Sequence, residues 1–66
     1  MIITVNGEQR DLADGASVTD LLACLGFDPA VTVVERNADI IERATYANTT
    51  LTEGDVLELV RFVGGG

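Results

Sequence analysis

The residues with the most distinctive chemistry are three consecutive glycines, Gly64, Gly65 and Gly66, which follow the apolar segment 56–63. Glycine lacks a Cβ atom and loses the most backbone entropy on ordering, so these residues add nothing to a hydrophobic core. A chain end without side chains suits insertion into a narrow site on another protein. We therefore predict that the free carboxylate of Gly66 is the reactive group, that Gly64 and Gly65 deliver it, and that other proteins perform the chemistry.

The composition excludes several other kinds of site. The sequence has no histidine, so the common catalytic triads are absent, and its single cysteine falls short of the about four ligands that a thiolate metal site needs. Cys24 is expected near a helix C-terminus, one turn after Asp20, which disfavours a reactive thiolate. We predict that Cys24 is a partly buried packing residue. The carboxylates of Asp11, Asp14, Asp20 and Asp28 are scattered near turns and caps, which indicates a solvated acidic surface without a metal site.

The charge balance narrows the possible partners. Eleven acidic residues stand against four arginines, no lysine is present, and the net charge is −7. Such a surface repels phosphate backbones, which argues against nucleic-acid binding, and it favours solubility or steering toward basic partners. No apolar run approaches the ~18 residues that a membrane span needs. No basic segment precedes the apolar residues Met1–Val5, so we predict a cytoplasmic protein without a secretory signal.

Several segments have the β-branched, apolar composition that is typical of strands. Between the first two, Asn6-Gly7 is a strong hairpin signal, because both central positions of a type I′ turn need positive φ. Further turns are expected at 36–39 and 53–55, and Tyr46 is expected to anchor the ambiguous segment 44–50. The expected strands are Met1–Val5, Glu8–Leu12, Val31–Glu35, a short piece beginning at Ile40, and Val56–Phe62.

One helix of about two turns is expected after the hairpin. Ser17 is a good N-cap, and Asp20 stands at the third helical position, as in a capping box with Asp in place of Glu. Gly26 fits the C-terminal cap, and Pro29 prevents continuation. A helix this short is marginal alone and must pack on a sheet. Its apolar stripe follows the helical period and comprises Val18, Leu21, Leu22 and Leu25.

The order of hairpin, helix and further strands predicts an α+β fold with the helix on one face of a mixed sheet. The first and last strands are expected to lie side by side and parallel, which requires a crossover that the helix supplies. This is the β-grasp, or ubiquitin-like, arrangement with four to five strands. We predict one domain over residues 1–63 and a flexible glycine tail over residues 64–66.

The last strand has two faces with different expected roles. By the two-residue period, Leu57 and Leu59 enter the core with Ile3 and Val5 of the first strand. Val60 and Phe62 then lie on the open face, where two exposed apolar residues beside a glycine tail would form a docking patch. The segment predicted to bind partners comprises Glu58, Val60, Arg61, Phe62 and Val63.

On these residues the whole chain resembles a known family, the ThiS family of small sulfur carrier proteins of thiamine biosynthesis. The terminal block is the most specific part of the resemblance, because the hairpin and helix patterns alone fit many domains. The matching elements are Val5–Glu8, Val18–Leu22, Val34–Asn37, Glu53–Asp55 and Val60–Gly66.

The resemblance implies a carrier that acts as cosubstrate of partner enzymes and is not itself an enzyme. An E1-like adenylyltransferase of the ThiF type would join the Gly66 carboxylate to AMP, using ATP and magnesium. A persulfide made by a cysteine desulfurase would supply sulfur, giving a thiocarboxylate. A thiazole synthase of the ThiG type would then take the sulfur for the thiazole ring. The nucleotide and metal belong to the partner, so the resemblance implies no cofactor for this chain.

Four alternatives remain compatible with the residues. Two lie within the same chemistry, namely a small subunit of molybdopterin synthase and a carrier for cysteine or other thio-metabolite synthesis. A third is a ubiquitin-like modifier that forms isopeptides, because the donor needs only the tail. The fourth is an interaction domain with an inert chain end.

Overall fold

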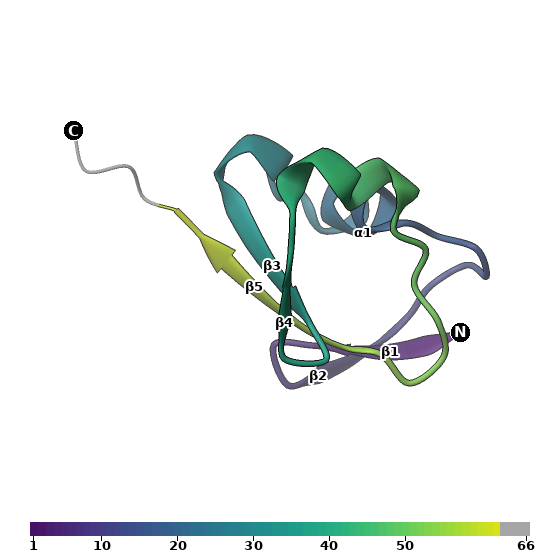
Figure 1. Ribbon diagram of the computed structural model, residues 1–66. Coiled ribbons are helices and arrows are strands. Elements are labelled where there is room, and N and C mark those ends of the chain that lie inside the picture. Colours follow the sequence, from purple (N-terminus) through teal and green to yellow (C-terminus); the bar gives the residue numbers. More distant parts are fainter. Residues whose placement is uncertain (63–66) are drawn as a thin grey trace.

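Five strands form one mixed sheet in the order β2-β1-β5-β3-β4 in the computed structural model (Figure 1). The structure describes residues 1–62, so the predictions for Val63 and for a tail at 64–66 lie outside the described residues. The predicted α+β, β-grasp arrangement is confirmed, with one main helix. The elements are β1 Ile2–Val5, β2 Glu8–Asp11, α1 Val18–Leu25, the 3-10 helix η1 Pro29–Val31, β3 Thr32–Arg36, β4 Asp39–Ile41, the 3-10 helix η2 Arg43–Asn48, and β5 Val56–Arg61.

Strand β5 occupies the middle of the sheet. It runs parallel to β1, with Val5 opposite Leu57, and antiparallel to β3, with Val34 opposite Leu59. The predicted parallel neighbourhood of the first and last strands is therefore confirmed. Because α1 lies between these strands in the chain, it provides the crossover that a parallel pair requires.

Two asparagines in hairpin turns bind β5 from both sides. Asn6 and Gly7 have φ values of 49° and 81°, as the predicted type I′ turn requires. The Asn6 side chain accepts a hydrogen bond from Leu59 N at 2.8 Å and donates one to Leu59 O at 3.3 Å. In the β3–β4 turn, Asn37 also has positive φ and accepts a bond from Val56 N at 2.9 Å. The turn residues thus extend the sheet's pairing with β5 beyond the strands themselves.

Helix α1 begins and ends as its sequence predicts. Ser17 Oγ accepts from Asp20 N at 3.1 Å, and Asp20 Oδ2 accepts from Ser17 N at 2.9 Å, which completes the capping box. Gly26 ends the helix with φ 75°, a left-handed conformation that costs glycine little. Pro29 then opens η1. The predicted stripe turns inward, since Val18, Leu21 and Leu22 are fully buried.

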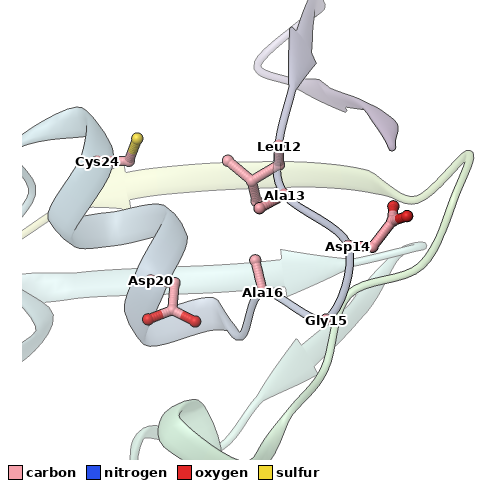
Figure 2. Close-up of a pocket in the computed structure, with 7 residues that line it drawn as sticks. All are labelled: Leu12, Ala13, Asp14, Gly15, Ala16, Asp20 and Cys24. Carbon is pink, nitrogen blue, oxygen red and sulfur yellow. The ribbon is translucent and has the colours of Figure 1, made fainter.

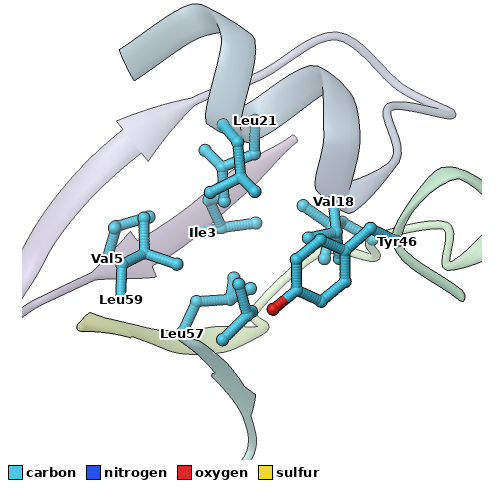
Figure 3. Close-up of a cluster of buried hydrophobic side chains, with 10 residues drawn as sticks. Ile3, Val5, Val18, Leu21, Tyr46, Leu57 and Leu59 are labelled. Carbon is cyan, nitrogen blue, oxygen red and sulfur yellow. The ribbon is translucent and has the colours of Figure 1, made fainter. Parts of the chain in front are cut away.

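The core lies between the sheet and the layer of α1 and η2, which occupy the same side of the sheet (Figures 1 and 3). The predicted inward orientation of Leu57 and Leu59 is confirmed by their burial. The opposite face of the sheet is covered by no element among residues 1–62. The buried cluster comprises Ile3, Val5, Val18, Leu21, Leu22, Val34, Tyr46, Leu51, Leu57 and Leu59.

Tyr46 fixes the segment whose conformation the sequence pattern does not determine. The segment forms η2, and its Tyr46 ring is 4% exposed. The phenol donates a hydrogen bond to the backbone carbonyl of Thr32 at 2.8 Å, within a buried region. The expected anchoring role of Tyr46 is therefore confirmed, and it joins η2 to the start of β3.

We predict that Tyr46→Phe lowers the free energy of unfolding by about 1–2 kcal/mol, because it leaves the buried Thr32 carbonyl without its donor while the ring stays in place. Urea unfolding followed by circular dichroism measures this loss. Thr45→Ala, which removes an exposed hydroxyl hydrogen bond to Glu42 O, serves as the control and should cost less. Equal stability of the native chain and Tyr46→Phe would contradict the anchoring role.

Among residues 1–62, Asp55 is the one buried charged side chain. Asp55 is 5% exposed and accepts hydrogen bonds from Arg36 Nε at 2.9 Å and Asn37 Nδ2 at 3.1 Å. It also accepts from the backbone N of Thr52 at 2.8 Å and from the Thr52 hydroxyl at 3.1 Å. Asp55 therefore joins the β3–β4 turn to the loop that leads into β5.

Candidate docking face and chain end

An apolar patch lies on the uncovered sheet face at the end of β5. Val60 and Phe62 are 54% and 63% exposed, so the side chains stand open to solvent as the two-residue period predicts. Val33 lies directly opposite Val60, and Phe62 N donates to the carbonyl of Val31. We call Val31, Val33, Val60 and Phe62 the apolar patch. It is the described surface nearest in sequence to Gly64–Gly66.

A shallow hollow borders the apolar patch. It is lined by Ala30, Val31, Arg43 and Phe62. The Arg43 side chain is held there by a hydrogen bond from its Nε to the carbonyl of Pro29 at 2.9 Å. The hollow therefore combines apolar walls with one fixed cation beside the end of β5.

The residues predicted to bind partners divide between two faces. Glu58 and Val60 share the open face, because they alternate with the buried Leu57 and Leu59. Arg61 instead points to the helix side, where its guanidinium lies 5.3 Å from the centre of the Phe27 ring. This distance is typical of a cation–π contact. The open face thus contains Glu58, Val60 and Phe62 of the predicted set, and Val63 lies outside the described residues.

Glu35 is a further residue of this face, and the sequence pattern alone does not single it out. It is the Cα partner of Glu58 in the β3–β5 pairing and is half-buried, whereas Glu58 is exposed. We call Glu35 and Glu58 the acidic pair. Each stands two residues from the apolar patch, beside Val33 or Val60. Only the register between β3 and β5 reveals the pair, and local sequence patterns do not determine the register of two distant strands.

Cys24 corrects one expectation. The sequence predicts a partly buried residue, but the structure shows an exposed thiol, so this prediction is wrong. The residue lies on the flank of α1, where it lines an open hollow with Asp20 (Figure 2). The opposite side of this hollow is formed by the segment 12–16. The predicted position of Cys24 on the flank of α1 is correct, but no neighbouring side chain among residues 1–62 covers that flank.

The acidic residues near turns and caps have structural partners. Asp14 and Asp11 lie 3.2 and 3.5 Å from the amino group of Met1, and Asp28 Oδ1 accepts from Ala30 N. The hydrogen bond that the Met1 amino group donates to the Asp14 carboxylate raises the pKa of this amino group. Among residues 1–62, no cluster of three metal-ligating side chains occurs, and no helix is long and apolar enough to cross a bilayer.

Comparison with known proteins identifies consistent relatives. A model described as the ThiS family matches residues 3–66. The "Sulfur carrier protein ThiS" of Bacillus subtilis is 42% identical over 53 residues, which cover 80% of each chain. A crystal structure of the thiamine biosynthesis protein ThiS from Geobacter metallireducens superposes with a TM-score of 0.85 at 36% identity, over 100% of both chains.

Longer relatives contain a similar sequence as one part of a larger protein. A protein named thiazole synthase from Paramagnetospirillum magneticum is 41% identical over 66 residues. A second thiazole synthase, from Magnetococcus marinus, is 42% identical over 66 residues. Each match covers 100% of this chain but 20% of the relative, so the chain spans about a fifth of the length of these two relatives.

Proposed function

Because the chain belongs to the ThiS family, we propose that it is a sulfur carrier of thiamine biosynthesis that presents the carboxylate of Gly66 to partner enzymes. The observation that carries this proposal is the extent of the family match, which runs through residues 64–66 and so includes all three glycines. An uncovered sheet face whose exposed residue Phe62 stands two residues before Gly64 in the sequence supports it.

The proposed chemistry begins with activation, because a carboxylate with delocalised charge is a poor electrophile. A carboxylate oxygen of Gly66 attacks the α-phosphorus of ATP on an adenylating enzyme, and pyrophosphate leaves. A persulfide sulfur, supplied by a cysteine desulfurase, then attacks the acyl carbon and displaces AMP. Cleavage of the persulfide bond by a thiol leaves a thiocarboxylate on Gly66. The chain is thus a cosubstrate, and ATP and magnesium are bound by its partner.

The proposed sulfur acceptor is the thiazole-forming enzyme. Two relatives of this chain occur within proteins named thiazole synthase, which supports a working contact between the two kinds of domain. After sulfur transfer the Gly66 carboxylate is regenerated. The proposed compartment is the cytoplasm, where an ATP-dependent activating enzyme has its substrate.

The intact mass of the chain purified from its host tests this proposal. We expect a fraction heavier by the difference between one sulfur and one oxygen atom, and we expect it to disappear when Gly66 is deleted. A set of conjugates to other proteins would instead indicate a modifier. A single unshifted mass under conditions of active thiamine synthesis would contradict the carrier function.

A second test concerns the apolar patch. We predict that Phe62→Asp weakens binding to the activating enzyme at least about tenfold, because exposed aromatic residues near an interface centre often dominate its energy. The Tm should change little, since Phe62 is 63% exposed. Titration calorimetry and thermal melts measure both quantities. Ala23→Asp is the control, because Ala23 is exposed on α1, which packs against the other face of the sheet. Loss of folding in Phe62→Asp would contradict the assignment of the faces.

A further inference from the structure

The acidic pair places two like charges on opposite residues of neighbouring strands, and no cation within residues 1–62 pairs with either of them. Glu35 and Glu58 are directly opposite each other across β3 and β5. Directly opposite residues have Cβ atoms about 4.5–5.5 Å apart, and like charges at such positions are destabilising. Neither carboxylate forms an ion pair within residues 1–62, whose ion pairs all involve other acids.

The cations of the chain are engaged elsewhere. The sequence has four arginines and no lysine, so no further side-chain cation is available. Each arginine has a partner away from the acidic pair: Arg10 lies 3.3 Å from Glu8, Arg36 lies 2.9 Å from Asp55, Arg43 binds the Pro29 carbonyl, and Arg61 stacks on Phe27. A cation that neutralises Glu35 and Glu58 must therefore come from another molecule.

The length of the chain beyond Phe62 places a partner over this face. Four residues separate Phe62 from the carboxylate of Gly66, and each spans at most ~3.3–3.6 Å, so the carboxylate reaches about 14 Å from Phe62. An enzyme that encloses this carboxylate in its active site brings its outer surface over the apolar patch. The acidic pair adjoins that patch, one step further along the same face.

We propose that the open face docks on a surface of the activating enzyme that presents one arginine among apolar side chains, and that Glu35 and Glu58 together accept its guanidinium. This inference rests on the proposed function. The planar guanidinium has donors that match carboxylates in bidentate fashion, and it is less strongly hydrated than an ammonium group, which suits a site bordered by Val33 and Val60. The repulsion between the two carboxylates in the free chain is then relieved on binding.

The proposal predicts opposite effects on binding and on stability. In pyrophosphate exchange with the activating enzyme, the double variant Glu35→Gln/Glu58→Gln should raise the KM for the chain roughly 10- to 100-fold, as loss of charge-assisted hydrogen bonds implies, with kcat unchanged. The salt dependence of this KM should flatten. The Tm of the double variant should equal or exceed that of the native chain, because a repulsion has been removed. Glu58→Arg, which pairs with Glu35 in the same chain, should raise the KM further and also raise the Tm.

Asp39→Asn is the matched control. It removes one exposed charge of β4 whose partner across the sheet is Arg36 and not Glu35, and it should leave the KM and its salt dependence unchanged. An unchanged KM in the double variant, with normal exchange by the native chain, would overturn the inference. A lowered Tm in the double variant would assign Glu35 and Glu58 a structural role and overturn it as well. Failure of the native chain to support exchange would overturn the proposed function beneath it.

Discussion

Deletion of Gly66 is expected to abolish adenylation while leaving the fold intact. The shortened chain still ends in a glycine carboxylate, but this group lies ~3.3–3.6 Å short of its position in the native chain, which is more than a nucleophilic attack tolerates. ATP–pyrophosphate exchange with the activating enzyme should therefore fall to background. The Tm should stay the same, because every residue of the buried cluster described above stands at or before Leu59.

Gly66→Ala distinguishes two requirements of the activating enzyme, namely the length of the chain end and the absence of a side chain at its last residue. This variant keeps the length and the carboxylate and adds one methyl group. We expect exchange to be reduced but measurable if reach is decisive, and to be lost if the receiving channel excludes any side chain. Normal exchange by the chain without Gly66 would contradict the role given to the terminal carboxylate.

Asp55→Asn is expected to have the largest effect on stability. The substitution keeps the shape but removes the charge that Arg36 faces, and it turns an amide N–H toward the donors of Asn37 and Thr52. Removing one member of a buried ion pair costs about 3–5 kcal/mol, and Arg36 is 26% exposed, so we expect the lower end, about 3 kcal/mol. At about 0.05–0.15 kcal/mol per residue, that is a large part of this domain's total stability. Urea unfolding at pH 7 measures the loss.

Acid unfolding gives an independent signature of Asp55. Burial pushes the pKa of this carboxyl upward, but hydrogen bonds from Thr52 and Asn37 and the charge of Arg36 outweigh it, so the pKa is lowered below 3.8. A depressed folded-state pKa contributes stability that is present above the unfolded pKa and lost as the pH falls through the folded value. The native chain should therefore lose stability below about pH 4, the ordinary aspartate range.

The loss below about pH 4 should be smaller in Asp55→Asn, because this variant has no proton to bind at position 55. Urea midpoints measured between about pH 7 and pH 2.5 make the comparison. Asp39→Asn, at an exposed position of β4, is the control and should follow the native curve. Parallel curves for the native chain and Asp55→Asn would show that the Asp55 network is not the source of the acid sensitivity.

Local signals predicted the elements well, because their energies depend on a few adjacent residues. The Asn6-Gly7 turn, the Ser17–Asp20 capping box and the Gly26 cap each satisfy backbone groups within one turn of chain, and all three are present. The parallel pairing of β1 and β5 followed from the chain order and the helix crossover. The role of the terminal glycines was predicted from the residues themselves, and the family resemblance added the adenylation and thiocarboxylate chemistry at Gly66, which stays a prediction.

Features that depend on distant segments were missed. The pairing of Glu35 with Glu58 depends on the register between two strands that are far apart in the chain. The exposure of Cys24 depends on how the segment 12–16 packs beside one flank of α1, which the helical period does not specify. The six-residue η2 has no clear apolar period, so only its buried Tyr46 could be anticipated.

The central position of β5 has a mechanical consequence for a chain that is held by its end. A force applied at the C-terminus acts along the axis of β5, which pairs with β1 on one side and β3 on the other. The hydrogen bonds of both strand pairs are then loaded in shear, together with the two hydrogen bonds between the Asn6 side chain and the Leu59 backbone. All of these bonds must therefore break together. A partner can therefore pull on the glycines without peeling the domain open one hydrogen bond at a time.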